Sequence, residues 1–222
     1  MERLFFDRTD AGEQLGRLVQ HALPVGERAD TVVLGLPRGG VPVAVAVAAV
    51  LGVPFDILPV RKLGLPFDPE VAMGAVAPGG VVYRDEEIIA WHRVSAEAFD
   101  YVLQRERAEL ERRMTRYRAG TPAPVITGRT VVVVDDGLAT GASMRAALLA
   151  LRAQQVGRSL VAVPVAPPGA AARFRDVADQ FLCVQTPRHF EGVSRHYEEF
   201  SQLSDDDVLA CLAAPGGPLA PA

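Results

Sequence analysis

Five short runs of aliphatic residues constrain the fold of this chain more than any other feature. Each run is rich in β-branched residues and continuous rather than alternating, which is typical of strands covered on both faces. The runs lie at 32–36, 55–60, 130–135, 160–165 and 180–184. Because helical patterns separate several of them, the sequence predicts an α/β fold with a doubly wound, mostly parallel sheet, whose ligands bind at the carboxyl ends of its strands.

Two helical patterns support this alternation. The stretch 41–50 is apolar on every side, which predicts a buried helix. The stretch 143–155 has an apolar stripe at i, i+3, i+4 and i+7, made by Met144, Ala147, Leu148 and Leu151. Each pattern follows one of the predicted strands, as expected for right-handed crossovers in a parallel sheet.

Two segments between 61 and 118 interrupt the alternation. Residues 61–80 are rich in Gly and Pro and lack sustained periodicity, so we expect a flexible lid loop there. Residues 95–118 predict a charged helix in which Glu109 and Arg113 pair at i, i+4. The remaining charges of that helix are interpreted as a solvated face.

Length and composition limit the classes of protein. The chain has 222 residues, 49% of them hydrophobic, which fits one domain over 1–213 and a disordered tail over 214–222. A net charge of −4 offers no overall field for nucleic acid. Charges within the first ten residues and short aliphatic stretches argue against a signal peptide or a membrane span, so we expect a cytoplasmic protein. Cys183 and Cys211 form no metal-ligand motif and are expected to be buried thiols.

The thirteen residues 131–143, VVVVDDGLATGAS, form the most specific pattern in the chain. A turn of small residues after a strand lets backbone N–H groups approach an anion, and the following helix adds the partial positive charge of its N-terminus. The absence of GxxxxGK[ST] and GxGxxG disfavours an NTPase or a dinucleotide-dependent oxidoreductase. We therefore predict a different phosphate site, made by Gly137, Leu138, Ala139, Thr140, Gly141, Ala142 and Ser143.

Asp135 and Asp136 indicate what else the ligand carries. Two carboxylates beside a phosphate would repel it unless they face sugar hydroxyls or a metal ion. A sugar phosphate is therefore the predicted ligand. For the Asp-Asp pair alone, a strand end with helix-capping aspartates is an equally good interpretation.

The stretch 131–143 resembles the phosphoribosyl pyrophosphate (PRPP) signature of the type I phosphoribosyltransferases. The resemblance implies that the loop binds the 5′-phosphate through its amides and the hydroxyls of Thr140 and Ser143. It also implies that Asp135 and Asp136 bind the ribose hydroxyls and stabilise the cationic centre that forms as pyrophosphate leaves. Mg²⁺ would be held mainly by PRPP, and Asp135 and Asp136 are candidate protein ligands.

Two further segments agree with this resemblance. The turn GLPRGG at 35–40 resembles the family's pyrophosphate loop, with Pro37, Arg38, Gly39 and Gly40 as candidate contacts. On its own such a turn is a common glycine-rich connection. Arg61 and Lys62 resemble the basic start of the flexible loop in adenine phosphoribosyltransferases, which implies that both reach the pyrophosphate and that Lys62 is a catalytic residue. Lys62 is also the only lysine among 23 Lys and Arg residues. The residues after Lys62 depart from that family's loop.

The N-terminal residues and 186–213 are expected to form a small hood, because 186–208 is similar to a poorly characterised bacterial branch of the family. Three aromatic residues there either stack on a base or form the core of the hood: Phe190, Tyr197 and Phe200.

The leading hypothesis is a phosphoribosyltransferase that moves ribose 5-phosphate from PRPP to a nitrogen acceptor, most simply a nucleobase. One alternative is a PRPP- or nucleotide-sensing regulator on the same fold, because a fold does not fix a function. Another is a hydrolase that uses water as the acceptor. Relatives of this type commonly form homodimers, which the sequence neither requires nor excludes.

Overall fold

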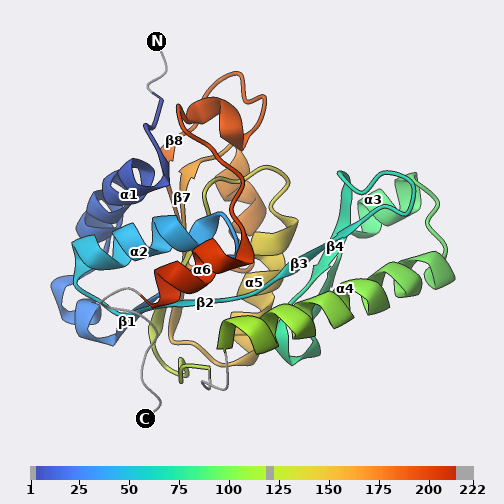
Figure 1. Ribbon diagram of the computed structural model, residues 1–222, viewed down its shortest axis with the longest axis horizontal. Helices are drawn as coiled ribbons and strands as arrows, with labels where there is room; N and C mark the ends of the chain where they lie inside the picture. The colour runs from blue at the N-terminus through green and yellow to red at the C-terminus, as the bar shows by residue number, and fades with distance from the viewer. Residues whose placement is uncertain (1–3, 119–122, 214–222) are drawn as a thin grey trace.

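The largest element of the computed structural model, which describes residues 4–118 and 123–213, is a five-stranded parallel sheet (Figure 1). Its strand order is β2-β1-β6-β7-β8. The strands are β1 (Thr31–Gly35), β2 (Phe55–Ile57), β6 (Thr130–Val134), β7 (Arg158–Val165) and β8 (Gln180–Gln185). Each overlaps its predicted run, so the predicted α/β fold with a mostly parallel sheet is confirmed. The predicted tail at 214–222 lies outside the described residues.

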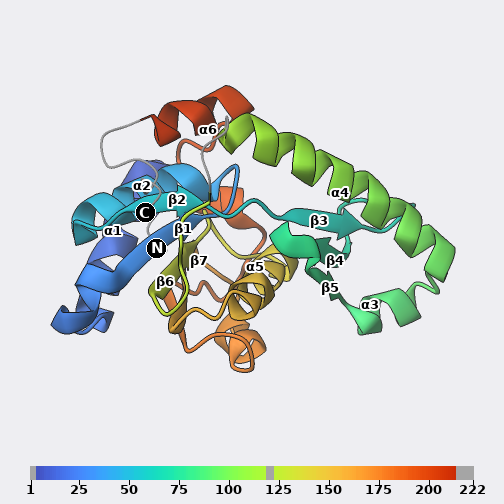
Figure 2. The ribbon, with the colours of Figure 1, turned by 90° about the horizontal axis from the view of Figure 1, so that it is seen from below.

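Helices cover both faces of this sheet, as Figure 2 shows. One face carries α1 (Arg8–Ala22), α2 (Gly40–Leu51) and α6 (Asp205–Leu212), and the other carries α5 (Ala142–Ala153). Within β6, Val132 and Val134 pack on the first side, and Val131 and Val133 on the second. Because both faces of β6 are buried, its side chains are apolar at every position and do not alternate with polar ones. This explains the run of four valines.

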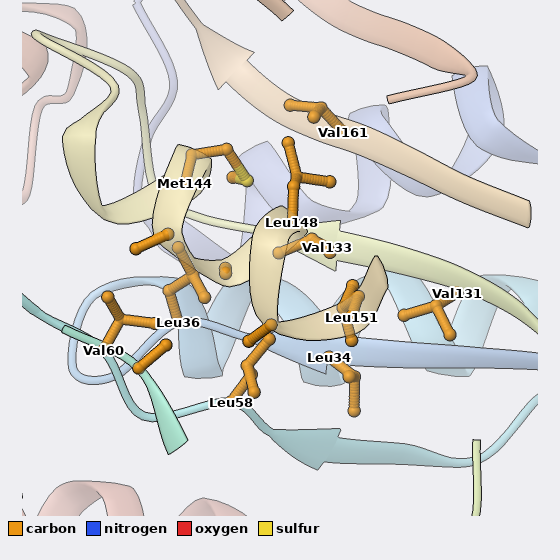
Figure 3. Close-up of a cluster of buried hydrophobic side chains, with 14 of the residues drawn as sticks. Leu34, Leu36, Leu58, Val60, Val131, Val133, Met144, Leu148, Leu151 and Val161 are labelled. Atoms are coloured by element: carbon orange, nitrogen blue, oxygen red, sulfur yellow. The ribbon is translucent and has the colours of Figure 1, made fainter. Parts of the chain in front are cut away.

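The packing of α5 confirms the predicted helical stripe. Met144, Leu148 and Leu151 project from α5 onto Val133 and Val161 of the sheet (Figure 3). All five side chains are at most 1% exposed. This packing fixes the start of α5, and with it the loop that connects β6 to the helix.

A second, antiparallel sheet extends from the edge of the first (Figures 1 and 2). Its strands are β3 (Arg61–Gly64), β4 (Ala72–Val76) and β5 (Val82–Arg84), and two helices back it, α3 (Glu86–Trp91) and α4 (Ala96–Arg118). The predicted helix at 95–118 is confirmed as α4. Its predicted ion pair is present, with Arg113 Nε donating to Glu109 Oε1 at 2.8 Å.

The prediction of a loop over the whole of 61–80 is wrong, because this segment contains β3 and β4. Strand β4 is buried on both sides: Met73 and Val76 pack toward α4, whereas Ala75 packs toward α5. Short strands of this kind, interrupted by Gly and Pro, leave no alternating pattern to detect. Closure of this segment over a ligand stays a prediction.

Smaller differences also have physical causes. Strand β2 ends at Ile57 rather than at Val60, since Pro59 cannot donate a ladder hydrogen bond. Cys183 and Cys211 are free thiols, but both are half-buried rather than fully buried. Across the described ranges, none of the helices is both long and apolar enough to cross a membrane.

Candidate functional site

The glycine turn at 37–40 and the predicted phosphate loop lie at the same edge of the parallel sheet. Strands β1 and β6 are neighbours, with Gly35 opposite Val134. The N–H of Leu36 donates to the carbonyl oxygen of Val134 at 2.9 Å, so the pairing continues past the end of β1. Because parallel strands end on the same side, the structure brings these two segments together.

Two glycines allow the turn to lie against the aspartates. A Cβ on Gly40 would lie 2.6 Å from the carbonyl oxygen of Val134 and 2.8 Å from Cα of Asp135. A Cβ on Gly39 would collide with the carboxylate of Asp136. These contacts explain why residues 39 and 40 are both glycine, because any side chain at either position would collide with the strand end or with Asp136. The preceding Pro37–Arg38 peptide bond is cis.

In each of Asp135 and Asp136, one of the two carboxylate oxygens accepts a hydrogen bond from the described part of the protein. Oδ1 of Asp135 accepts from the backbone N–H of Asp136 at 2.9 Å, and Oδ2 of Asp136 accepts from Nε of Arg8 at 3.0 Å. Among the described residues, Oδ2 of Asp135 and Oδ1 of Asp136 have no hydrogen-bond partner. The pair therefore keeps two strong acceptors for hydroxyl groups or a cation.

Burial makes this pair reluctant to ionise. It raises the pKa of Asp135 well above the ordinary range, and the charge of Asp136 raises that pKa further. Burial also raises the pKa of Asp136, whereas the charge and the hydrogen bond of Arg8 lower it. Raised pKa values of this kind are frequent at functional sites.

The loop after Asp136 carries hydrogen-bond donors that no described residue engages. Its middle is anchored by Leu138, which is 2% exposed and whose N–H donates to the Val165 carbonyl oxygen at 2.8 Å. Gly141 precedes α5 with φ of +82°, and no side chain caps the first amides of the helix. In the part of the chain that the structure describes, the hydroxyls of Thr140 and Ser143 have no partner. This arrangement can accept an anion at the N-terminus of α5.

Arg38 lies in the turn at 37–40 and is half-buried. Burial raises the pKa of Tyr117 of α4 to about 12, with the charge of Arg38 acting weakly in the opposite direction. Hydrogen bonds with Ser204 lower the pKa of Asp207 of α6, and the charge of Arg38 adds to this effect. No hydrogen bond or ion pair within the described ranges holds Arg38. Arg38 therefore remains available to a ligand at this edge.

Arg61 and Lys62 differ in how firmly they are held. Arg61 donates to Oε2 of Glu106 from Nε at 2.9 Å and from Nη2 at 2.6 Å, and Glu106 is 7% exposed. Lys62 donates to the carbonyl oxygen of Glu70 at 3.1 Å and lies 3.7 Å from its exposed carboxylate. Arg61 thus ties β3 to α4, whereas the weak surface pair of Lys62 can yield to a ligand.

Two contacts of Asp136 were not foreseen from the sequence. Arg8, at the start of α1, pairs with its carboxylate, and the Tyr197 hydroxyl donates to its backbone carbonyl oxygen at 2.5 Å. Arg8 is 128 positions away from Asp136 and is one arginine among many, so no local spacing points to it. Only the three-dimensional packing of α1 against the sheet edge reveals it.

The hood aromatics form a small core. Tyr197 is 5% exposed and packs with Phe5, which is fully buried. Phe190 and Phe200 pack against the same cluster from its margin. Of the two alternatives left by the sequence, the structure favours a hood core for Tyr197, and its phenol contributes to the site through the hydrogen bond to Asp136.

A cleft of about 540 Å³ lies beside the loop, between the start of α5 and strand β5. Thr140, Gly141 and Ala142 line one side of it, and Tyr83 of β5 lines the other. Arg173 also borders the cleft and donates to the Thr140 carbonyl oxygen at 3.2 Å. The loop is therefore open to solvent where the second sheet approaches it.

A magnesium ion fits this edge if the ligand supplies most of its oxygens. The free oxygens of Asp135 and Asp136 are suitable hard ligands. No group of three or more His, Cys, Asp or Glu residues within the described ranges could hold a metal ion alone. A Mg²⁺ ion usually keeps several waters and binds one or two carboxylates together with phosphate oxygens, which is compatible with this pair.

These features define an α/β protein with paired carboxylates and an anion-accepting loop at the carboxyl edge of its sheet. The chain belongs to the family described as "Phosphoribosyl transferase domain", which matches residues 15–199. The family resemblance drawn from 131–143 is thereby confirmed, and the matched range covers both loops of the candidate site.

Individual relatives agree with the family. A Mycobacterium tuberculosis protein that bears the provisional name of phosphoribosyl transferase is 45% identical over 210 residues, which cover 95% of this chain and 46% of that protein. This chain thus spans about half the length of that relative. TT1426 from Thermus thermophilus is 40% identical, with a TM-score of 0.77 and coverage of 95% of this chain and 97% of that one. AQ2163 from Aquifex aeolicus, 13% identical with a TM-score of 0.50 over 80% of this chain and 73% of that one, shares the fold alone.

Proposed function

We propose that this protein transfers ribose 5-phosphate from PRPP to a nitrogen acceptor, a nucleobase being the simplest, and releases pyrophosphate. The observation that carries the proposal is the pair of unpartnered oxygens on Asp135 and Asp136, set beside a loop with open amides. A ribose phosphate has hydroxyls for the first and a phosphate for the second.

Each segment has a role in this proposal. The 5′-phosphate binds at Ala139, Thr140, Gly141, Ala142 and Ser143, and the ribose hydroxyls donate to Asp135 and Asp136. The turn from Pro37 to Gly40 binds pyrophosphate through its amides and Arg38. Lys62 reaches the same group when the segment 61–80 closes, and closure excludes water from the reacting carbon.

The chemistry requires no covalent nucleophile. The bond between C1 of the ribose and pyrophosphate breaks with its electron pair going to pyrophosphate, and the lone pair of the acceptor nitrogen forms the new C1–N bond. A proton is then released from that nitrogen. The ionised carboxylates stabilise the positive charge that develops at C1. Bound Mg²⁺ would neutralise charge on the departing pyrophosphate.

The test is to incubate the protein with PRPP, Mg²⁺ and a panel of purines, pyrimidines and other nitrogen acceptors, and to measure pyrophosphate. We expect release that depends on one acceptor and is lost in the Asp135→Asn/Asp136→Asn double variant. An Arg17→Gln variant, which removes an exposed ion pair on α1, is the matched control and should keep full activity.

Other outcomes would contradict the proposal in different ways. Pyrophosphate release without any acceptor would indicate a hydrolase. Tight PRPP binding without release for any acceptor would indicate a sensor. A ligand-bound crystal structure with phosphate density elsewhere, and none at 139–143, would exclude the site itself. Homodimer formation and a cytoplasmic location stay predictions.

A further inference from the structure

The short 3₁₀ helix Ala170–Phe174 lies against the proposed phosphate loop. Nη1 of Arg173 donates to the carbonyl oxygen of Thr140 at 3.2 Å. Phe174 is 2% exposed, and Cζ of its ring would lie 2.8 Å from a Cβ on Gly141. The Thr140–Gly141 peptide unit is therefore contacted at its carbonyl oxygen by Arg173 and at the following Cα by Phe174.

The hydrogen bond from Arg173 determines the direction of the Gly141 N–H. A trans peptide unit is planar, so its C=O and its N–H point in opposite directions. Within the described ranges only the Pro37–Arg38 bond is cis, so the Thr140–Gly141 unit is trans. The Gly141 N–H consequently points away from Arg173, and no described residue accepts a hydrogen bond from it.

Arg145 of α5 holds the backbone of Arg173. Its Nη1 donates to the carbonyl oxygen of Arg173 at 2.8 Å and to Oδ1 of Asp176 at 3.1 Å, and its Nη2 pairs with Oδ2 of Asp176. The guanidinium carbon of Arg145 lies 5.5 Å from the centroid of the Tyr83 ring in β5. Arg145 thus joins the start of α5 to residues 173–176 and to the second sheet.

We propose that Arg173 is a positioning residue of the phosphate site. Its hydrogen bond to the Thr140 carbonyl oxygen turns the Gly141 N–H toward the 5′-phosphate, and Arg145 keeps Arg173 in place. This inference rests on the proposed function, because it deepens the account of the same phosphate site. It gives two arginines outside the pattern at 131–143 a part in ligand binding.

The positive charge of Arg173 could by itself attract a phosphate, and Arg175 separates this effect from positioning. Both side chains are exposed, and they are two positions apart in the sequence. Arg175 has no hydrogen bond or ion pair in the part of the chain that the structure describes. Substituting Arg175 therefore removes a neighbouring charge without removing a contact with the loop.

The experiment compares Arg173→Ala, Arg173→Lys and Arg145→Gln with wild type and with Arg175→Ala. Heteronuclear NMR follows the assigned Gly141 amide as ribose 5-phosphate is added. Calorimetry measures the affinity for ribose 5-phosphate, and the affinity for pyrophosphate when ribose 5-phosphate is saturating. The proposed function places that pyrophosphate at the turn 37–40, away from Arg173. Urea unfolding measures the stability of each variant.

We expect ribose 5-phosphate to shift the Gly141 amide of wild type. Arg173→Ala should lower the affinity for ribose 5-phosphate about three- to tenfold, the value of one ordinary hydrogen bond. Arg145→Gln should lower it by less, and Arg173→Lys should recover part of the loss because it keeps a donor. Arg175→Ala should match wild type, and the affinity for pyrophosphate should be the same in every variant.

Several outcomes would overturn the inference. A loss for Arg175→Ala as large as for Arg173→Ala would indicate a general effect of charge. No loss for Arg173→Ala, or equal losses for both ligands, would indicate a purely structural role. A Gly141 amide that ribose 5-phosphate does not shift in wild type would exclude the phosphate site together with the role of Arg173. If the amide shifts and Arg173→Ala weakens binding as expected, but no acceptor receives ribose 5-phosphate from PRPP, the proposed transfer fails and the role of Arg173 stands.

Discussion

Two carboxylate–arginine pairs lie at the parallel sheet, and they differ in how completely the protein satisfies them. Asp56 of β2 is 1% exposed, and both of its oxygens are used: Oδ1 accepts from the N–H of Ile57 at 2.6 Å and Oδ2 from Arg118 at 2.7 Å. Asp136 also accepts from an arginine, but keeps one oxygen without a described partner.

The difference separates a structural carboxylate from one that can bind a ligand. Arg118 also donates to the Ile57 carbonyl oxygen at 3.1 Å, so the Asp56 pair joins the end of α4 to the sheet. Asp135 and Asp136, in contrast, combine raised pKa values with free acceptors, which is disadvantageous for the fold and useful for binding.

The largest effect is expected for Asp56→Asn. The substitution leaves Arg118 as a nearly buried charge without its counterion, which typically costs about 3 to 5 kcal/mol. Urea unfolding measures this loss. A loss of unfolding free energy below about 1 kcal/mol, as for an exposed pair, would show that the pair of Asp56 with Arg118 does not stabilise the fold.

Asp136→Asn should instead act on affinity. It removes a charged acceptor that is worth about 1.5 to 3 kcal/mol, so the affinity for PRPP should fall by a factor of roughly 10 to 150 in calorimetry. Stability should fall less than for Asp56→Asn, because Arg8 still donates to the Ser201 carbonyl oxygen and lies over the Phe200 ring. Unchanged PRPP affinity would refute the sugar-binding role.

Asp135→Asn should change how stability depends on pH. The folded-state pKa of Asp135 is raised, so the folded state binds a proton more tightly than the unfolded state, and stability falls as pH rises from the ordinary Asp range to the folded-state pKa. The variant lacks this decline, which amounts to about 1.4 kcal/mol for each unit of pKa shift. Parallel stability curves for variant and wild type, from urea unfolding over that pH range, would contradict this sign.

The smallest effect is expected for Lys62→Ala. Its side chain is 37% exposed, so a contact with pyrophosphate should contribute about 0.5 to 1.5 kcal/mol. PRPP affinity should fall, whereas affinity for a nucleoside monophosphate, which lacks pyrophosphate, should not. Glu70→Gln is the control, since it removes only the ion pair of Lys62 with the Glu70 carboxylate and should not weaken PRPP binding. Equal losses for both ligands would place Lys62 outside the site.

The sequence predicted what local patterns encode. Continuous valines marked β6 because both of its faces are buried, and the stripe on 143–155 marked α5. The order of these elements then placed the turn at 37–40 and the loop after Asp136 at one edge, because parallel strands end together.

Local patterns could not predict contacts between segments that are distant in the sequence. Nothing near Arg8 indicates that it reaches Asp136, and nothing near Arg61 indicates that Glu106 holds it. Strand β4 was missed because its small residues, such as Gly74 and Ala75, pack between two layers without alternating. In each case, tertiary packing determines the structure and local propensity does not.

The central claim is that the free oxygens of Asp135 and Asp136 accept hydrogen bonds from ribose hydroxyls. Calorimetry with ribose 5-phosphate and 2-deoxyribose 5-phosphate tests this most directly, because the two ligands share the phosphate and differ by one hydroxyl. We predict that wild type binds ribose 5-phosphate about tenfold or more tightly, the value of one hydrogen bond to a charged group, and that the Asp135→Asn/Asp136→Asn double variant loses most of this preference. Equal affinity of wild type for the two sugars would contradict the account.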